Sequence, residues 1–439
     1  MNAHYRTVCS GAVLAFAIVA GRGTSLGAGP PVQHRAFAPQ ISRDAVSVEQ
    51  HLPAVPGGWP SLLKVGVSDP PGGAARVAGD GFGFRYQYLA GGSNTGTGWA
   101  SWNPNGEFVT HYVSESAAAG VTPVFSYYMI RQSIPGASRD EPQGVRTNLQ
   151  NDATMRSYLD DVELFFERAG ASGSTVVFHF EPDLWGFVQQ SSQDDDGRTF
   201  KVAVGSTQQK YANGRPDNAA GLAQTVVAMR DALAPNVVLG YHASWWGIGE
   251  DPAYSNPSDH RMRELAARSA AFYESLGTNF DVVFMEFSDR DAAFKQYVYG
   301  DGGASWWDSD DFRRHLDFIR DFVQLTGLRV VLWQIPQGNT KMRAMDNTWN
   351  HYQDNRVQWL FDNPNFVNLK AYVDAGVIAL LFGRGADGAT CACDANGDGV
   401  TNPAPINGND RVSLNSDDDG GYFREKLATY FAQGSLLLP

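Results

Sequence analysis

The chain has 439 residues, of which 43% are hydrophobic and 18% are charged, a composition typical of a globular protein. Its formal charge of −13 disfavours binding to nucleic acids and to anionic membranes, because both are polyanions. The same charge disfavours a strongly anionic substrate, so we expect a neutral one.

The N-terminal residues 1–28 have the pattern of a secretory signal peptide. Arg6 supplies a positive charge, the segment from Gly11 to Ala20 is apolar, and small residues follow. That apolar segment is shorter than the roughly 20 residues that span a bilayer. A membrane anchor is the alternative. We expect a secreted, extracellular protein.

Residues 29–59 are rich in Pro, Ala, Gly and Ser and show no clear hydrophobic period. We interpret them as a linker or N-terminal arm. Residues 60–439 then remain for one catalytic domain, and none of their segments is long and apolar enough to span a bilayer.

Short apolar runs alternate with longer amphipathic stretches throughout this domain. The apolar runs predict strands over residues 64–68, 84–89, 122–129, 175–180, 237–242, 281–287, 329–335 and 377–382. The amphipathic stretches predict helices over residues 107–119, 153–169, 218–233, 260–276, 309–325, 355–375 and 421–432. The first connection, residues 69–83, is rich in Gly and Pro, so its helix should be short or missing.

This alternation predicts the α/β class and a (β/α)8 TIM barrel with long loops at the C-terminal face of the strands. An open, doubly wound sheet is the rival architecture. No G-x-G-x-x-G motif opens a first helix here, as nucleotide binding in such a sheet would require.

Carboxylates follow two of the predicted strands directly. The fourth strand leads into Glu181-Pro182-Asp183, and the sixth ends at Glu286 with Asp289 close behind. Reactive groups of α/β barrels lie where the strands end. Hydrolysis of a glycosidic bond needs a proton donor and a second carboxylate across that bond.

We therefore predict Glu181 as the general acid and Glu286 as the nucleophile or base. Asp183 and Asp289 are further candidates for the second carboxylate. The alternative for Glu286 is a supporting role or an ion pair with Arg290.

Other polar side chains occupy comparable positions on or just after the predicted strands. Such groups can bind sugar hydroxyls or tune the pKa values of the carboxylates. Each could equally be a hydrogen-bonded polar residue of the core. The candidates for substrate binding are Asp69, Arg85, Gln87, Tyr128, His179, His242 and Gln334.

Most of the 11 tryptophans fall in the loops that follow the strands. Flat aromatic rings match the apolar C–H faces of sugar rings, which predicts substrate platforms. The alternative is that some of these rings fill the mouth of the barrel as core. The residues concerned are Trp99, Trp102, Trp185, Trp245, Trp246, Trp306 and Trp307, with Trp349 after the seventh strand.

One acidic segment matches the opening of a calcium loop. Asp394, Asn396 and Asp398 occupy the first, third and fifth positions, and Gly399 follows. The twelfth position is Pro405, so the usual bidentate acid is missing, and Asp410 or the acidic run at 417–419 would have to replace it. A turn without metal is the alternative.

No cofactor is expected for the chemistry itself, and calcium would be structural. A metal-dependent hydrolase is disfavoured because the nine His residues show neither HxH nor HExxH spacing. Cys391 and Cys393 are separated by one residue, a spacing that rarely gives good disulfide geometry without strain, so they could pair under export conditions or stay free. A zinc site would need more ligands.

On these residues the chain resembles the (β/α)8 glycoside hydrolase superfamily. Glu181-Pro182 look like the second half of the Asn-Glu-Pro signature at the end of strand four. The resemblance implies that Glu181 is the acid/base of a retaining enzyme whose nucleophile is a Glu at the end of strand seven. This chain departs twice, because Phe180 replaces the Asn and Gln334 stands where that nucleophile would be.

The expected function is therefore a secreted glycoside hydrolase acting on a neutral, β-linked polysaccharide such as a β-glucan or cellulose. We expect a monomer whose partner is the polysaccharide, with no nucleic acid and no membrane. The alternative is a barrel that binds polysaccharide without cutting it, which the missing strand-seven Glu supports.

Overall fold

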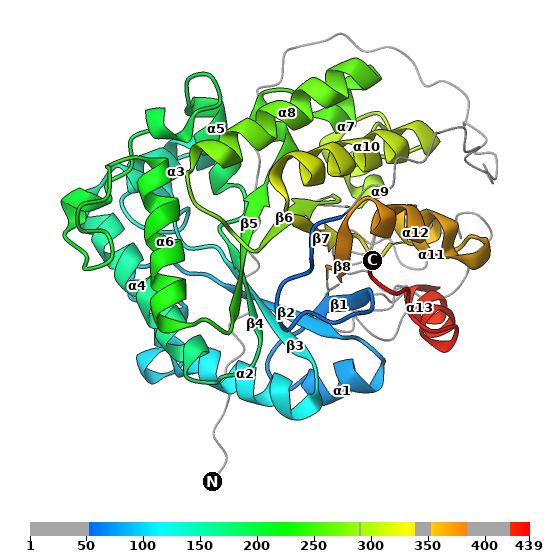
Figure 1. The fold of residues 1–439 in the computed structure, drawn as a ribbon, viewed down its shortest axis with the longest axis horizontal. Helices are drawn as coiled ribbons and strands as arrows, with labels where there is room; N and C mark the ends of the chain where they lie inside the picture. Colours follow the sequence, from blue (N-terminus) through cyan, green and yellow to red (C-terminus); the bar gives the residue numbers. More distant parts are fainter. Residues whose placement is uncertain (1–51, 289–290, 339–352, 384–421) are drawn as a thin grey trace, which may run out of the picture. The chain divides into compact units, whose positions relative to one another are not determined.

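The computed structural model describes residues 52–288, 291–338, 353–383 and 422–439. Eight parallel strands close into a barrel in which each strand pairs with the next and β8 pairs with β1. Figure 1 shows the helices that surround these strands. The predicted (β/α)8 barrel is confirmed.

The barrel strands follow the chain in order around the barrel. They are β1 (Lys64–Ser68), β2 (Phe84–Leu89), β3 (Thr122–Tyr127), β4 (Val176–Phe180), β5 (Val237–Ala243), β6 (Val282–Glu286), β7 (Arg329–Ile335) and β8 (Val377–Phe382).

The helices fall into long ring helices and short helices at the ends of strands. They are α1 (Ala74–Gly79), α2 (Glu107–Ala119), α3 (Glu141–Leu149), α4 (Asp152–Gly170), α5 (Leu184–Ser191), α6 (Ala219–Leu233), α7 (Pro252–Ser255), α8 (Asp259–Ser275), α9 (Ala292–Phe294), α10 (Ser309–Thr326), α11 (Arg356–Phe361), α12 (Val367–Asp374) and α13 (Tyr422–Ala432).

Every predicted strand is present, and the first connection carries only the six-residue helix α1, as expected. The single helix predicted over residues 355–375 is wrong, because two helices, α11 and α12, occupy that range. Between them Asn365 and Phe366 have φ values of 53° and 52°, a left-handed conformation that no continuous helix accepts.

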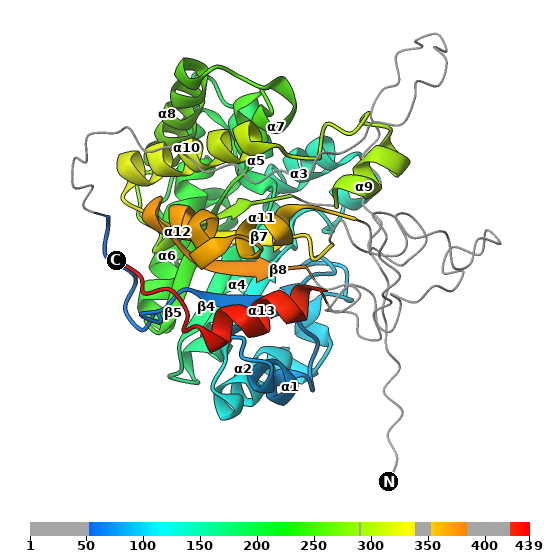
Figure 2. The same cartoon turned by 90° about the vertical axis from the view of Figure 1, so that its right-hand side faces the viewer.

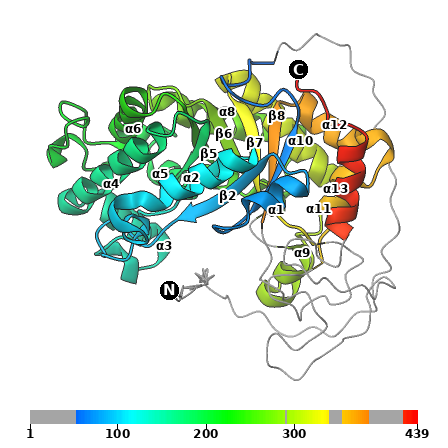
Figure 3. The same cartoon turned by 90° about the horizontal axis from the view of Figure 1, so that it is seen from below.

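The ring helices pack against one another as well as against the sheet. Helices α8 and α10 lie side by side (Figures 1 and 2). Helix α13 lies near α11 and α12 (Figure 3), and both Tyr422 and Lys426 bind the carboxylate of Asp362 just after α11. Within the described ranges no helix is both long and apolar enough to cross a membrane.

The barrel interior is filled by alternate residues of the strands. Gly240 on β5 leaves room for a large neighbour, because a Cβ there would lie 2.4 Å from Cε2 of Phe284. The inward side chains form one apolar cluster, made of Trp59, Phe84, Tyr86, Val124, Val177, Val238, Val282, Phe284, Val331, Trp333, Ile378, Ala379 and Leu381.

Trp59 closes the N-terminal end of this interior. Its ring centroid lies 5.0 Å from that of Phe84, and its indole Nε1 donates to the carbonyl of Ile378 at 3.3 Å. Val55 packs on the same cluster. The last residues of the predicted arm are therefore part of the barrel body, whereas residues 1–51 lie outside the described part of the chain.

We predict that Trp59→Ala lowers the free energy of unfolding by about 3–5 kcal/mol, because it opens a cavity in the barrel interior. Urea unfolding followed by circular dichroism measures the change. Trp102→Ala is the control, since the Trp102 side chain is 41% exposed. A loss below about 1 kcal/mol for Trp59→Ala would show that the ring does not close the barrel.

Candidate active site

The chain turns sharply where β4 ends. Glu181 and Asp183, on either side of Pro182, have φ values of 51° and 68°. Such conformations cost non-glycine residues about 1–3 kcal/mol each and gather at functional sites. The two carboxylates consequently do not share one face, as an extended strand would require, and they enter different surroundings.

Glu181 is fully buried in the layer between the barrel and helix α4. Its Oε1 accepts hydrogen bonds from the backbone N–H groups of Met129 and Ile130 at 3.0 and 2.9 Å, and from the hydroxyl of Tyr158 at 2.9 Å. Burial raises the pKa of Glu181 to about 8, although these hydrogen bonds act in the opposite direction. The carboxyl group is therefore protonated at neutral pH.

This environment does not fit the general-acid role predicted for Glu181. The side chain has no exposed surface that a substrate could reach. Its hydrogen bonds connect the loop after β3 to helix α4, so the side chain stabilises the fold.

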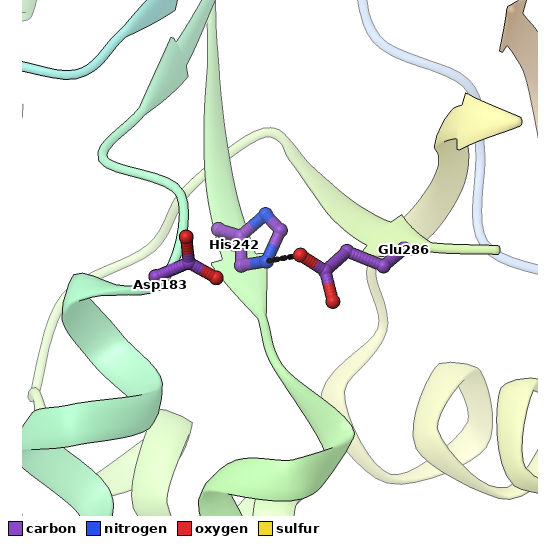
Figure 4. A group of neighbouring side chains, drawn as sticks. All are labelled: Asp183, His242 and Glu286. Carbon is purple, nitrogen blue, oxygen red and sulfur yellow. Dashed lines mark ion pairs between the residues drawn. The ribbon is translucent and has the colours of Figure 1, made fainter. Parts of the chain in front are cut away.

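Asp183 has different surroundings from Glu181. It precedes the first turn of α5, but its side chain accepts no hydrogen bond from that turn. Figure 4 shows its carboxylate facing His242 and Glu286. One oxygen of Asp183, one ring nitrogen of His242 and one oxygen of Glu286 all lie within 4.8 Å of one another. We call these three residues the triad.

The other two members of the triad stand on neighbouring strands. His242 is on β5 and Glu286 ends β6. Nε2 of His242 lies 4.0 Å from Oε1 of Glu286, and the Glu286 side chain is 13% exposed. The predicted candidates Asp183, His242 and Glu286 are thus brought together from three segments that are far apart in the sequence.

A line of hydrogen bonds inside the barrel supports the triad. Oγ of Ser126 on β3 lies 3.2 Å from Nδ1 of His179 on β4, and Nε2 of His179 lies 2.8 Å from Nδ1 of His242. All three side chains are fully buried. This line, which we call the histidine relay, ends at Nε2 of His242, beside Glu286.

Both histidines of the relay are neutral at physiological pH. Burial lowers the pKa of His242 to about 3 and holds that of His179 well below its usual value. A neutral imidazole has one donor and one acceptor nitrogen, so the two rings can share a hydrogen bond. Among the described residues Nε2 of His242 has no hydrogen-bond partner.

Two aromatic residues on inward positions border the relay. Phe284 stacks on His179 with ring centroids 4.0 Å apart, and Trp333 lies edge-on to His179 at 4.7 Å and to His242 at 5.7 Å. Trp333 was not among the predicted site residues. Its place in the alternation of β7, in register with Glu286, is the signal that would have identified it.

Gln334 and Tyr88 join β7 to β2. Gln334 has a φ of 51°, and its side-chain amide donates to the hydroxyl of Tyr88 at 2.5 Å. Tyr88 itself packs against Trp333, with ring centroids 5.9 Å apart. Tyr88 was missed by the sequence analysis, which placed Arg85 and Gln87 of the same strand in the site.

Tyr128 lies close enough to Asp183 for the charge of that carboxylate to act on its hydroxyl. Its hydroxyl donates to Oε1 of Glu141 at 2.6 Å. Burial raises the pKa of Tyr128, and the negative charges of Glu141 and Asp183 raise it further. Tyr128 therefore stays protonated, and its single donor hydrogen is taken by Glu141.

The predicted binding roles of Asp69, Arg85 and Gln87 do not fit the structure. Arg85 points toward helix α2, where its guanidinium lies 3.9 Å from the ring centre of Tyr112, and it forms an ion pair with Asp69 at 2.7 Å. Both charged groups are buried. Gln87 shares the face of Arg85, since alternate residues of a strand point to opposite sides.

Three of the predicted aromatic platforms, Trp99, Trp185 and Trp307, are buried core residues instead. Trp99 donates its indole N–H to Asp161 and is fully buried, and Trp185 packs against Tyr241 and Phe280. Trp99 lies in a short helix after β2 and Trp185 lies in α5, and both rings belong to the main hydrophobic core.

The other described tryptophans differ in their burial. Trp307 packs among Phe287, Phe312, His315 and Trp245, and Trp246 packs against Phe187. Trp306 is half-buried and donates to Gln296, and Trp102 is exposed.

Several predicted residues lie outside the described part of the chain. They are Asp289, Arg290 and Trp349, the calcium-loop candidates Asp394, Asn396, Asp398 and Asp410, and the cysteines Cys391 and Cys393. The calcium loop therefore stays a prediction.

No family model and no curated protein matches this chain. Solved structures with a similar fold include a GH26 β-mannanase from Bacteroides ovatus, with 14% identity over 83% of this chain and 88% of that one and a TM-score of 0.39. A GH10 endoxylanase from a sugarcane soil metagenome shares 9% identity over 79% of this chain and 90% of that one, with a TM-score of 0.36.

An HpcH/HpaI aldolase from Desulfitobacterium hafniense is also similar, with 10% identity over 74% of this chain and 87% of that one and a TM-score of 0.30. The similar structures thus include proteins whose names differ in class, two glycoside hydrolases and an aldolase. At this level the similarity concerns the fold alone, so the function has to be argued from the site.

We predict that Glu181→Gln gains stability relative to the wild type as the pH rises from about 5 to 8. The folded protein keeps the Glu181 proton up to about pH 8, whereas the unfolded chain releases it near pH 4.5. Through this one carboxyl group the wild type loses about 1.4 kcal/mol of stability per pH unit in that window, and the Gln variant lacks that loss.

Urea unfolding at several pH values measures this difference between the two proteins. Glu167→Gln, on the exposed side of α4, controls for the loss of a carboxylate. A constant difference between Glu181→Gln and the wild type over this window would contradict a protonated Glu181.

Proposed function

We propose that this protein is a glycoside hydrolase that cleaves a neutral, β-linked polysaccharide, with Asp183 and Glu286 as its two catalytic carboxylates. The observation that carries the proposal is their spacing, with oxygens within 4.8 Å of each other after β4 and at the end of β6. Catalytic residues of (β/α)8 enzymes stand at this end of the strands.

The spacing supports a retaining mechanism. Retaining enzymes hold their two carboxyl groups about 5–5.5 Å apart, whereas inverting enzymes leave about 6.5–9.5 Å for a water molecule. Glu286 would attack the anomeric carbon while Asp183 gives its proton to the leaving oxygen. Water would then attack the glycosyl-enzyme ester, passing a proton to Asp183 and freeing Glu286.

The surroundings of Glu286 suit the role of nucleophile. Its side chain is mostly buried, so few water molecules solvate the carboxylate. The neighbouring His242 is neutral and places a polar nitrogen near the carboxylate without forming a permanent ion pair. A charged histidine there would hold the anion and reduce its reactivity.

The choice of a neutral polysaccharide such as a β-glucan rests on charge and on the expected export. The formal charge of −13 opposes an anionic polymer. Residues 1–28 support a secreted protein that meets polysaccharides outside the cell. N-terminal sequencing of the protein from the culture medium tests that export.

We predict that Asp183→Asn and Glu286→Gln each reduce turnover at least about a hundredfold, because each removes a group that takes part in the bond-breaking steps. Reducing-end release from a panel of neutral polysaccharides is the assay. Glu181→Gln, in the same loop, is the matched control and should retain activity within a few-fold.

The outcomes separate the alternatives. A dead Glu181→Gln variant beside an active Asp183→Asn variant would overturn the assignment. If the wild type binds a polysaccharide but releases no reducing ends, the protein is a binding barrel, an interpretation that Gln334 at the end of β7 supports.

We also predict that the first product has the same anomeric configuration as the substrate, because the carboxylates are too close for an inverting water. Proton NMR of the product in the first minutes of reaction measures this. A product of opposite configuration would exclude Glu286 as nucleophile and would require a more distant second carboxylate.

A further inference from the structure

The triad combines one imidazole nitrogen with two carboxylates at the ends of three neighbouring segments (Figure 4). We propose that Asp183, His242 and Glu286 bind one divalent transition-metal ion. Mixed nitrogen and oxygen donors of this kind suit Mn²⁺, Fe²⁺ and Zn²⁺ better than Ca²⁺, which takes oxygen ligands.

A second observation points to a ligand at the same place. Nε2 of His242 is completely buried, lies 4.0 Å from Oε1 of Glu286, and has no hydrogen-bond partner among the described residues. A buried polar atom left without a partner costs about 1–3 kcal/mol. A metal ion between these side chains would satisfy that nitrogen.

The histidine relay supplies the support that a metal-binding histidine needs. A ligating histidine almost always uses its other ring nitrogen for a hydrogen bond, which fixes the tautomer. Nδ1 of His242 lies 2.8 Å from Nε2 of His179, whose Nδ1 lies 3.2 Å from Oγ of Ser126. If His242 donates through Nδ1 and His179 does the same to Ser126, the lone pair on Nε2 of His242 faces the triad.

The distances suit a cation after small side-chain movements. Metal–ligand bonds of about 2.0–2.2 Å place neighbouring ligand atoms roughly 3–4 Å apart. The triad atoms lie within 4.8 Å of one another, so side-chain rotations that move the carboxylates inward by about 1 Å are sufficient. Three protein ligands leave further coordination positions for water or for substrate hydroxyls.

The metal ion and the proposed hydrolysis would use the same carboxylates. Bound metal would hold both Asp183 and Glu286, so it should inhibit that hydrolysis. The binding itself does not depend on the proposed function, because it can be measured without substrate.

The test is a titration of the full chain with Mn²⁺ in a background of millimolar Ca²⁺, followed by the electron paramagnetic resonance signal of free Mn²⁺. The Ca²⁺ fills oxygen-only sites, including any at residues 394–410. We expect one Mn²⁺ per chain in the wild type and at least tenfold weaker binding in His242→Gln and in Asp183→Asn.

His260→Gln is the matched control. Nδ1 of His260 lies 3.6 Å from a carboxylate oxygen of Glu264, but the pair is exposed, and among the described residues no third ligand joins it in the triad's arrangement. This variant should bind Mn²⁺ as the wild type does. Circular dichroism checks that each variant is folded. If His242→Gln does not fold, the binding measured with Asp183→Asn decides the test.

No Mn²⁺ binding by the wild type, or equal binding by the wild type and the folded triad variants, would overturn the proposal. The two proposals fail separately. Binding of Mn²⁺ by a protein that cuts no polysaccharide would remove the hydrolase alone, and hydrolysis by a protein that binds no Mn²⁺ would remove the metal site alone.

Discussion

The hydrogen bond between His179 and His242 is the interaction on which the site depends. It lies inside a closed barrel, where neither ring reaches water, and burial keeps both rings neutral. Two charged imidazoles at this distance would repel each other in a medium that screens charge poorly. Two neutral rings can instead form one hydrogen bond, in which a nitrogen of one ring donates to a nitrogen of the other. The rigidity of the histidine relay sets the position of Nε2 of His242.

The stagger of the strands explains why the relay reaches the end of the barrel. His179 is in register with Gly240, so His242 stands two residues further along β5. His242 is in register with Phe284, so Glu286 stands two residues further along β6. Each step therefore moves toward the C-terminal ends of the strands. Closure of an eight-stranded barrel requires such a stagger, and here it carries a buried hydrogen bond toward the catalytic face.

The strands could be predicted from the sequence because buried parallel strands are continuous apolar runs, and all eight were found. It was harder to predict whether a polar residue on or after a strand faces the barrel interior or the surrounding helices. Alternation would place Glu181 and Asp183 on one face, but two left-handed residues broke it and sent Glu181 into the core. On β2 the inward positions belong to Tyr86 and Tyr88, so Arg85 faces α2.

The triad could not be recognised as a group from the sequence, because its members are separated by tens of residues and meet only when the barrel closes. The HxH pattern therefore has no bearing on the proposed metal site, whose ligands come from three separate segments. The prediction of Trp99, Trp185 and Trp307 as substrate platforms was wrong for a related reason. Position after a strand places a residue near the catalytic face, but helices such as α5 then decide whether the ring is covered.

The central claim is that a neutral histidine pair holds the triad, and nitrogen-15 NMR of the histidine rings tests it most directly. A coupling between Nε2 of His179 and Nδ1 of His242 across their hydrogen bond would identify the pair, and His242→Gln would remove it. The account predicts that both rings stay neutral between about pH 5 and pH 8. Titration of either ring near its ordinary pKa of about 6.5 would contradict it.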